Sequence, residues 1–165
     1  MSRFAVSGRS VVVVPGVTLA VGPFRARAGL SPRLPGLHEK AQELAAAVAA
    51  QSADGSVLLL KRGATAPWMP GRWNLPGGVA DHGEPLEETA RRETAEETGL
   101  RVGELRKLLT VVEPESRTVF FHTTDFEGEV QTDWESAEAR WVPVGEARSY
   151  DLVPGVVEAL DRIGG

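Results

Sequence analysis

The sequence of 165 residues contains no cysteine. Its absence excludes disulfide bonds, thiolate nucleophiles and cysteine-ligated zinc sites as the basis of any function. A chain without cysteine suits a reducing compartment, where disulfides do not form. We therefore expect a cytoplasmic protein.

Long apolar runs are also missing. The longest β-prone stretch, SVVVVPGVTLAVGPF at residues 10–24, is broken by Pro15-Gly16 and Gly22-Pro23. A membrane-spanning helix needs roughly 18 consecutive apolar residues. The stretch also lacks the basic flank and cleavage site of a signal peptide. The sequence therefore predicts no membrane partner.

Basic clusters are absent as well, although charge is unevenly distributed. The formal net charge is −5, yet residues 1–40 sum to +5 and the remainder to −10. Nucleic-acid binding usually requires basic residues gathered on one face, and here they are scattered. The pattern favours a solvated or self-docking basic arm over a nucleic-acid partner.

The composition itself is that of one ordinary domain, with 42% hydrophobic and 25% charged residues. Residues 10–24 predict a β-hairpin turning at Pro15-Gly16. Residues 28–37, AGLSPRLPGL, predict a linker. We expect residues 1–37 to be an N-terminal extension with a β-prone arm, and residues 38–165 to be the main domain.

Within the main domain, strands surround a central helix. The alanine-rich residues 39–51 have high helix propensity, but Asp54-Gly55 and the following Val57–Leu60 indicate a turn between two strands. Later β-like runs occupy residues 105–112, 118–126 and 139–144. A closing helix is expected over residues 154–163, with Pro154 near its start and Val157, Leu160 and Ile163 on one face. This order predicts an α/β or α+β fold with a mixed β-sheet.

The central helix concentrates negative charge. The stretch GGVADHGEPLEETARRETAEETGL, residues 77–100, holds six glutamates and one aspartate against two arginines. Pro85 suits the helix start and Gly99 the C-terminal cap. Acidic residues in the first turn are favoured by the helix dipole, but Glu93, Glu96 and Glu97 repel one another near its negative end. Helix physics alone leaves a solvated acidic face and a divalent-cation site equally open.

The residues around these glutamates resemble the Nudix box, G-x5-E-x7-R-E-U-x-E-E-x-G-U, in which U is a bulky apolar residue. All seven fixed letters match, and Leu100 supplies the closing U. Thr94 departs from the pattern at the first U, although its methyl group can still pack inward. The resemblance covers about residues 43–163. It implies a Nudix-like α/β/α sandwich and favours a strand over about residues 44–51.

For the site, the resemblance implies Mg²⁺ or Mn²⁺ bound by Glu93, Glu96 and Glu97, with the Gly78 carbonyl as a further ligand. Carboxylates are the ligands that these hard cations prefer. Glu84 is expected to bind through water or from the second shell of ligands. Arg92 is expected to orient a glutamate by a charge-assisted hydrogen bond.

The general base varies within this family. The MutT-type pattern places it six residues before a strand tryptophan, which here indicates Glu135 before Trp141, with Glu138 as a rival. Trp73 is expected in the core, whereas Trp68 and Trp134 are expected in loops. His38, His82 and His122 carry no signal of a role.

The resemblance implies hydrolysis of a nucleoside diphosphate linked to another group. The short tail after the box favours a MutT-type nucleoside triphosphate pyrophosphohydrolase. An ADP-ribose or nucleotide-sugar pyrophosphatase is the alternative, because Pro114 lies 15 residues past Gly99 where that branch typically places proline at 16. β arms in that branch often build homodimers, so dimerisation through residues 10–24 is a further expectation. A nucleotide-binding sensor without catalysis is the reading from another class, and the intact box argues against it.

Overall fold

The computed structural model describes residues 3–6, 9–14, 17–21, 42–133 and 135–164. Three sheets form the fold. The largest has seven strands in the order β1-β2-β3-β9-β10-β4-β7. In chain order these strands are β1 (Arg3–Val6), β2 (Arg9–Val14), β3 (Val17–Val21), β4 (Glu43–Ala50), β7 (Gly77–Val79), β9 (Arg106–Val112) and β10 (Ser116–Thr123).

The other two sheets are smaller. Strands β12 (Ser136–Pro143), β5 (Ser56–Arg62) and β6 (Trp73–Asn74) form an antiparallel sheet, and β11 (Phe126–Glu127) pairs with β8 (Arg101–Val102). The helices are α1 (Leu86–Thr98), the short α2 (Val144–Ala147) and α3 (Val156–Ile163). No helix among the described residues is both long and apolar enough to cross a membrane.

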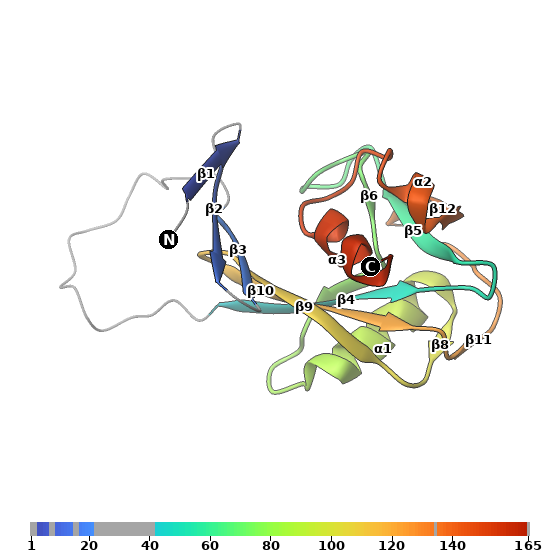
Figure 1. Cartoon of the computed structure of the whole chain (residues 1–165). Coiled ribbons are helices and arrows are strands. Elements are labelled where there is room, and N and C mark those ends of the chain that lie inside the picture. The colour runs from blue at the N-terminus through green and yellow to red at the C-terminus, as the bar shows by residue number, and fades with distance from the viewer. Residues whose placement is uncertain (1–2, 7–8, 15–16, 22–41, 134, 165) are drawn as a thin grey trace.

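The seven-stranded sheet is mixed and has helices on both faces (Figure 1). Strand β4 runs parallel to β10 but antiparallel to β7. On one face, Ala46 and Val48 of β4 pack with Ala90 of α1. On the other face, Ala47 and Ala49 belong to the large core that includes residues of α3 and of the three-stranded sheet. The expected α/β/α sandwich with a mixed sheet is therefore confirmed.

The alanine run forms β4, so the strand expected at about residues 44–51 is confirmed over the helix that propensity favours. Alternate side chains of β4 face α1 and the α3 side, and both faces are buried from Ala46 onward. Small side chains let helices approach both faces of the sheet closely. Tertiary packing thus overrides the helix propensity of alanine.

The turn at Asp54-Gly55 is also present, with Gly55 at φ +85°. It does not close a long hairpin, however. Beyond the turn, one bridge between Gln51 and Val57 pairs the two segments. Strand β4 belongs to the seven-stranded sheet, whereas β5 belongs to the three-stranded sheet. The turn therefore connects two sheets.

Strand β9 agrees with the expected residues 105–112, but two other ranges differ. Strand β10 ends at Thr123, and Phe126 belongs to β11. The Thr123 hydroxyl donates to Glu104 O and accepts from Asp125 N, which ends the strand. Strand β12 starts at Ser136 and not at the expected residue 139, because Ser136 already pairs with Arg62 at the end of β5.

The closing helix corrects a face assignment. Helix α3 begins at Val156 and buries Val156, Ala159 and Leu160, whereas Val157 is 41% exposed. Val157 lies three residues before Leu160, but this spacing alone does not determine on which side of Leu160 the buried stripe of the helix lies. The contact with the sheet selects the i, i+3, i+4 set.

At the N-terminus, β2 and β3 pair antiparallel with Val14 opposite Val17, as expected for a hairpin. Strand β1 adds a further antiparallel neighbour, and β3 meets β9 in parallel at Thr18 and Val111. The predicted turn at residues 15–16 and the linker at residues 28–37 lie outside the described residues. The boundary near residue 38 stays a prediction.

Candidate metal and nucleotide site

Helix α1 carries most of the candidate site. It begins after Pro85, whose extended backbone has φ −61° and ψ 139°. It ends at Gly99, whose φ of +75° lets its N–H donate to Ala95 O at 2.9 Å. The left-handed conformation at this cap favours glycine. The helix buries a face of small residues, Thr89, Ala90, Thr94 and Thr98.

Two consecutive glycines of β7 bring the sheet against the glutamates. A Cβ atom on Gly77 would lie 2.2 Å from Ala46 O, and one on Gly78 would lie 2.5–2.8 Å from the Glu93 carboxyl group. Glycine has no Cβ atom, so the backbone can come this close at both positions. The Gly77 N–H also donates to Glu97 Oε2 at 3.1 Å. The glycines thus place backbone directly beside two of the expected metal ligands.

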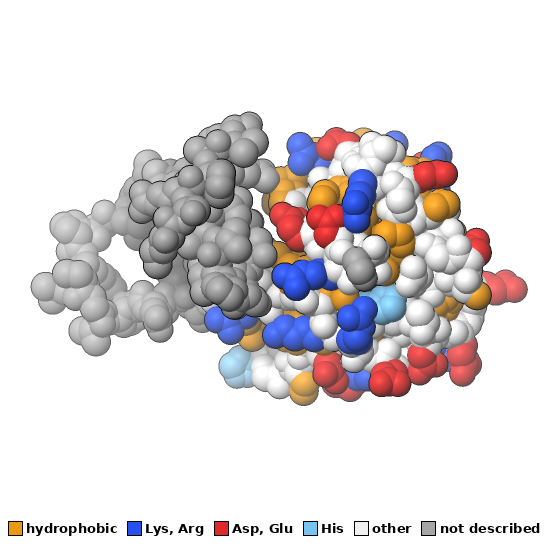
Figure 2. All heavy atoms as spheres, viewed as in Figure 1, with side chains coloured by type: hydrophobic (Ala, Val, Ile, Leu, Met, Phe, Trp, Pro, Cys, Tyr) orange, Lys and Arg blue, Asp and Glu red, His pale blue; other side chains and the backbone are white. Residues whose placement is uncertain are grey.

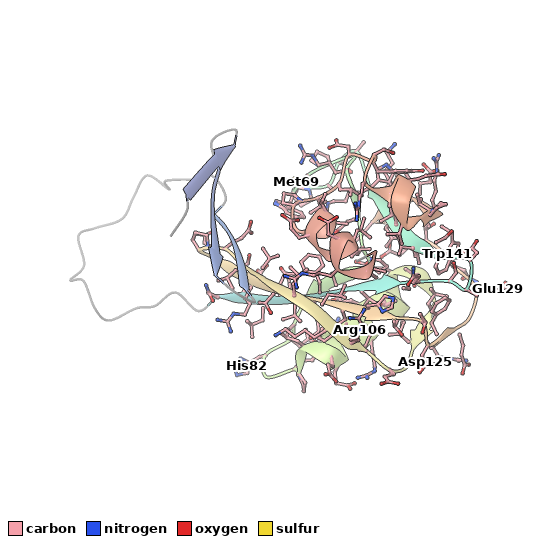
Figure 3. All side chains as sticks on the ribbon, in the orientation of Figure 1. Met69, His82, Arg106, Asp125, Glu129 and Trp141 are labelled. Atoms are coloured by element: carbon pink, nitrogen blue, oxygen red, sulfur yellow. The ribbon has the colours of Figure 1, made fainter. Side chains whose placement is uncertain are left out.

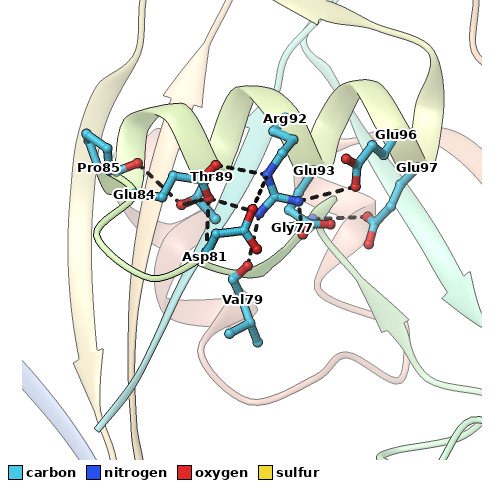
Figure 4. A network of polar contacts seen from close by, with 10 residues as sticks. All are labelled: Gly77, Val79, Asp81, Glu84, Pro85, Thr89, Arg92, Glu93, Glu96 and Glu97. Carbon is cyan, nitrogen blue, oxygen red and sulfur yellow. Dashed lines mark hydrogen bonds and ion pairs between the residues drawn. The ribbon is translucent and has the colours of Figure 1, made fainter. Parts of the chain in front are cut away.

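Arg92 connects the acidic residues into one network (Figure 4). Its Nε and Nη2 donate to the two oxygens of Glu84, each at 2.9 Å. Its Nη1 donates to Glu93 at 2.8 Å and to Glu96 at 3.3 Å. The expected orienting role of Arg92 rests on these contacts, since one planar guanidinium holds three carboxylates.

The network separates the pKa values of the carboxyl groups. Hydrogen bonds from Arg92 and Thr89 lower the pKa of Glu84 to about 2. Burial raises the pKa of Glu97 to about 8, against the hydrogen bond from Gly77 and with the negative charges of Glu93, Asp133 and Glu135 adding to the shift. Burial also raises the pKa of Glu93, although Arg92 opposes it. A cation beside Glu97 would relieve this repulsion.

The chemistry of these donors fits a hard divalent cation, because all are oxygens and most are carboxylates. Within the described ranges, no ion pair joins Glu97 to a cationic side chain. Among the same described residues, no group of three or more His, Asp or Glu side chains is arranged so that it could hold a metal ion. Glu93 and Glu96 both accept hydrogen bonds from Arg92 Nη1.

A pocket of about 310 Å³ adjoins the acidic residues and extends toward the small sheet. Glu97 and Glu135 both line it, together with Leu60, Arg62, Gly63, Thr65, Ala66, Pro67, Asn74, Leu75, Gly77 and Ser136. Apolar walls with a few polar groups are typical of small-molecule sites. The pocket therefore brings the two acidic residues together with apolar residues such as Leu60 and Leu75 and polar ones such as Asn74.

The two rival general bases have different surroundings. Glu135 lies just before β12 on the pocket wall, and its backbone carbonyl accepts from Gly63 N at 3.2 Å. Glu138 lies within β12 and forms an ion pair with Arg140. Of these two residues, only Glu135 lines the pocket that Glu97 lines.

The remaining candidates separate clearly. Trp73 is 7% exposed and belongs to the core, as expected, whereas Trp68 is 48% exposed. His82 is exposed and projects from the loop before α1 (Figure 3). His122 bonds to Gln51 at 2.9 Å, away from the pocket lining. Trp134 and His38 lie outside the described residues.

Sequence reasoning missed three polar residues at the site. Thr89 donates to Glu84 at 2.7 Å, Asp81 lies 3.7 Å from Arg92, and Asp133 contributes to the raised pKa of Glu97. Asp81 and Thr89 occupy box positions that accept any residue, so the motif gives no signal for them. Asp133 lies two residues before Glu135 and could have been found by the same loop argument.

Comparisons with known proteins agree with this geometry. Residues 41–163 match the family model described as NUDIX domain. The chain is 37% identical over 120 residues to "Putative 8-oxo-dGTP diphosphatase 3" of Mycobacterium tuberculosis, covering 67% of this chain and 55% of that protein. It is 39% identical over 108 residues to the RNA pyrophosphohydrolase of Caulobacter vibrioides, covering 60% and 56%. The chain thus spans a little over half the length of these relatives.

Among solved structures, the MutT NUDIX hydrolase from Burkholderia pseudomallei superposes with a TM-score of 0.65 at 25% identity, covering 75% of this chain and 99% of that one. The family model covers most of the chain, including both β7 glycines and all of α1. The chain therefore belongs to the NUDIX domain family, with MutT proteins among its structural neighbours.

Proposed function

We propose that the protein is a metal-dependent nucleoside triphosphate pyrophosphohydrolase of the MutT type. It would convert a nucleoside triphosphate and water into a nucleoside monophosphate and pyrophosphate. The observation that carries the proposal is that Glu97 and Glu135 line the same pocket, together with apolar residues such as Leu60. A nucleoside would occupy the part of the pocket away from Glu97 and Glu135, and its phosphates would lie near these two carboxylates.

The names of the relatives support this reaction class. A nucleotide diphosphatase and an RNA pyrophosphohydrolase both cleave bonds between phosphate groups, as their names state. The carboxylate pair and pocket are what such a reaction needs from the chain. The exact substrate would be set by loops outside the box, because loops are generally the parts of a fold that carry specificity.

The residues divide the work as follows. A bound Mg²⁺ or Mn²⁺ supplies charge neutralisation of the pyrophosphate and lowers the pKa of the attacking water. Glu93, Glu96 and Glu97 would hold the ion with the Gly78 carbonyl, and Arg92 would orient the glutamates it contacts. Glu84 holds Arg92 through two hydrogen bonds. Glu135 would accept the proton of the water at its carboxylate.

A screen of nucleoside triphosphates, oxidised nucleotides, ADP-ribose, nucleotide sugars and dinucleoside polyphosphates with Mg²⁺ and Mn²⁺ tests the proposal. We expect a triphosphate to give the highest kcat/KM, with pyrophosphate as product. The matched control is Glu97→Gln, which keeps an acceptor for Gly77 N–H but removes the charge, and should lower turnover by at least about a hundredfold.

The screen also separates the alternatives. Preference for ADP-ribose or a nucleotide sugar would select the second pyrophosphatase branch, which Pro114 and the β arm favour. Tight nucleotide binding with no product from any substrate would instead identify a nucleotide-binding sensor.

A further inference from the structure

Thr89 is a buried hydroxyl on the helix that carries the glutamates, and the Nudix box assigns it no role. Its side chain is fully buried, yet it belongs to the polar network in Figure 4. The hydroxyl has two acceptors within reach, Glu84 Oε1 at 2.7 Å and Pro85 O at 3.3 Å. Because it has one proton, the shorter contact with the charged oxygen is favoured.

Glu84 is fixed by this contact. Its Oε1 accepts from Thr89 at 2.7 Å, from Arg92 Nη2 at 2.9 Å and from Asp81 N at 3.3 Å, while Oε2 accepts from Arg92 Nε at 2.9 Å. The side chain is 16% exposed, so little water is available to replace a lost donor. A rigid carboxylate with two parallel contacts sets the plane of the guanidinium.

The orientation of the guanidinium plane in turn determines where Arg92 Nη1 points. With Nε and Nη2 held by Glu84, and Nη2 also donating to Val79 O at 3.1 Å, Nη1 points to Glu93 and Glu96. A continuous path of hydrogen bonds therefore runs from Thr89 through Glu84 and Arg92 to two expected metal ligands. Each link in the path is 3.3 Å or shorter.

We propose that Thr89 is a positioning residue for the metal-binding carboxylates, acting through Glu84 and Arg92. It touches neither metal nor substrate. This inference rests on the proposed function, because it assumes that Glu93 and Glu96 bind a divalent cation. Outer hydrogen-bond partners of this kind typically change metal affinity by tenfold or more.

The experiment compares Mn²⁺ affinity, measured by titration without substrate, among the purified full-length protein and its variants. Thr89→Val removes the hydroxyl and keeps the shape, so we expect about tenfold weaker Mn²⁺ binding at a nearly unchanged melting temperature. Thr89→Ser keeps the hydroxyl and loses the buried methyl, so it should melt earlier yet bind Mn²⁺ as the parent does. Thr89→Ala is a second hydroxyl-free variant if the valine form folds poorly.

Thr94 provides the matched control, because it is equally buried on the same helix and its hydroxyl bonds to no described residue. Thr94→Val should leave Mn²⁺ affinity unchanged. A double-mutant cycle with Glu84→Gln tests the path: Thr89→Val should add little once Glu84 is neutral.

The outcomes are distinct. Parent-like Mn²⁺ affinity in Thr89→Val, or the same loss in the Glu84→Gln background, overturns the positioning role and leaves the proposed function standing. Absence of Mn²⁺ binding by the unmodified protein overturns both.

Discussion

The Glu97 carboxyl group is half-buried among other carboxyl groups. Its titration should therefore make the stability of the protein depend on pH. Its pKa of about 8 in the folded, metal-free protein lies above the ordinary value of 4.5. Between these values the folded state binds more protons than the unfolded state, so this group's contribution to stability falls as pH rises through that window. Denaturant titrations of metal-free parent and Glu97→Gln between pH 5 and pH 9 should show the parent losing stability relative to the variant. Parallel pH profiles would contradict the raised pKa.

The same proton competes with the metal. Because a cation must displace it from Glu97, Mn²⁺ affinity should rise with pH by up to about tenfold per unit below pH 8 and then level off. Titrations at pH 6.5, 7.5 and 8.5 measure this, with release of a proton in the calorimetric signal as a second indicator. An affinity that does not change over this range would exclude Glu97 as the competing group.

Thr94 poses a separate question of stability. Its Oγ1 is the one buried side-chain oxygen or nitrogen without a hydrogen bond among the described residues. Replacing an unsatisfied hydroxyl with a methyl of similar size removes a desolvation cost. Thr94→Val should therefore stabilise the protein by about 1 kcal/mol in denaturant unfolding. A destabilised variant would show that water satisfies the hydroxyl.

At the scale of elements, the contact between β7 and α1 gives a matched pair of substitutions. In Gly77→Ala the new methyl meets the backbone of β4, which cannot move aside. In Gly78→Ala it meets the end of the Glu93 side chain, which can rotate away. We expect the first variant to lose several kcal/mol of stability, whereas the second keeps its fold and loses metal affinity. Thermal unfolding and Mn²⁺ titration separate the two, and equal stability losses would contradict the assignment.

Motif and periodicity predicted the elements unevenly, for identifiable reasons. The caps of α1 and strand β9 follow from local signals, namely Pro85, Gly99 and an apolar run. The buried face of α3 and the end of β10 depend on contacts that lie far away in sequence. A sequence pattern gives the spacing of the apolar residues, but it does not show which side of the helix packs against the sheet.

The site was predictable where the motif fixes a residue and unpredictable where it does not. Glu84, Arg92 and Glu93 do lie within one hydrogen-bonded network, as the box implies. The pocket wall formed by Asn74, Thr65 and Ser136 comes from three separate segments, and no spacing in the chain connects them. The assigned metal roles remain proposals that the titrations above test.

At the scale of the whole molecule, the face shown in Figure 2 carries both acidic and basic side chains over the described residues that it colours. Strands β1, β2 and β3 lie to one side of the rest of the fold, and β3 joins it by pairing with β9 (Figure 1). The candidate site uses residues from 60 onward.

Removal of residues 1–37 should therefore leave the metal site working. We expect kcat/KM and Mn²⁺ affinity within about threefold of the full chain. The deletion exposes the edge of β9, so the shortened protein should aggregate more readily. Light scattering of both forms also tests the expected homodimer, which the deletion should convert to a monomer. A folded but inactive core would show that the arm completes the pocket.

The parallel contact between β3 and β9 also bears on how the protein is made. About 85 residues separate the end of β3 from the start of β9 along the chain. At roughly 5–20 residues per second, the ribosome needs roughly 4 to 17 seconds to supply them. The arm can close its own hairpins at once, but the free edge of β3 must wait that long for its partner. During translation the unpaired edge of β3 (Val17–Val21) is thus exposed, and we expect the nascent chain to be most prone to aggregation at that stage.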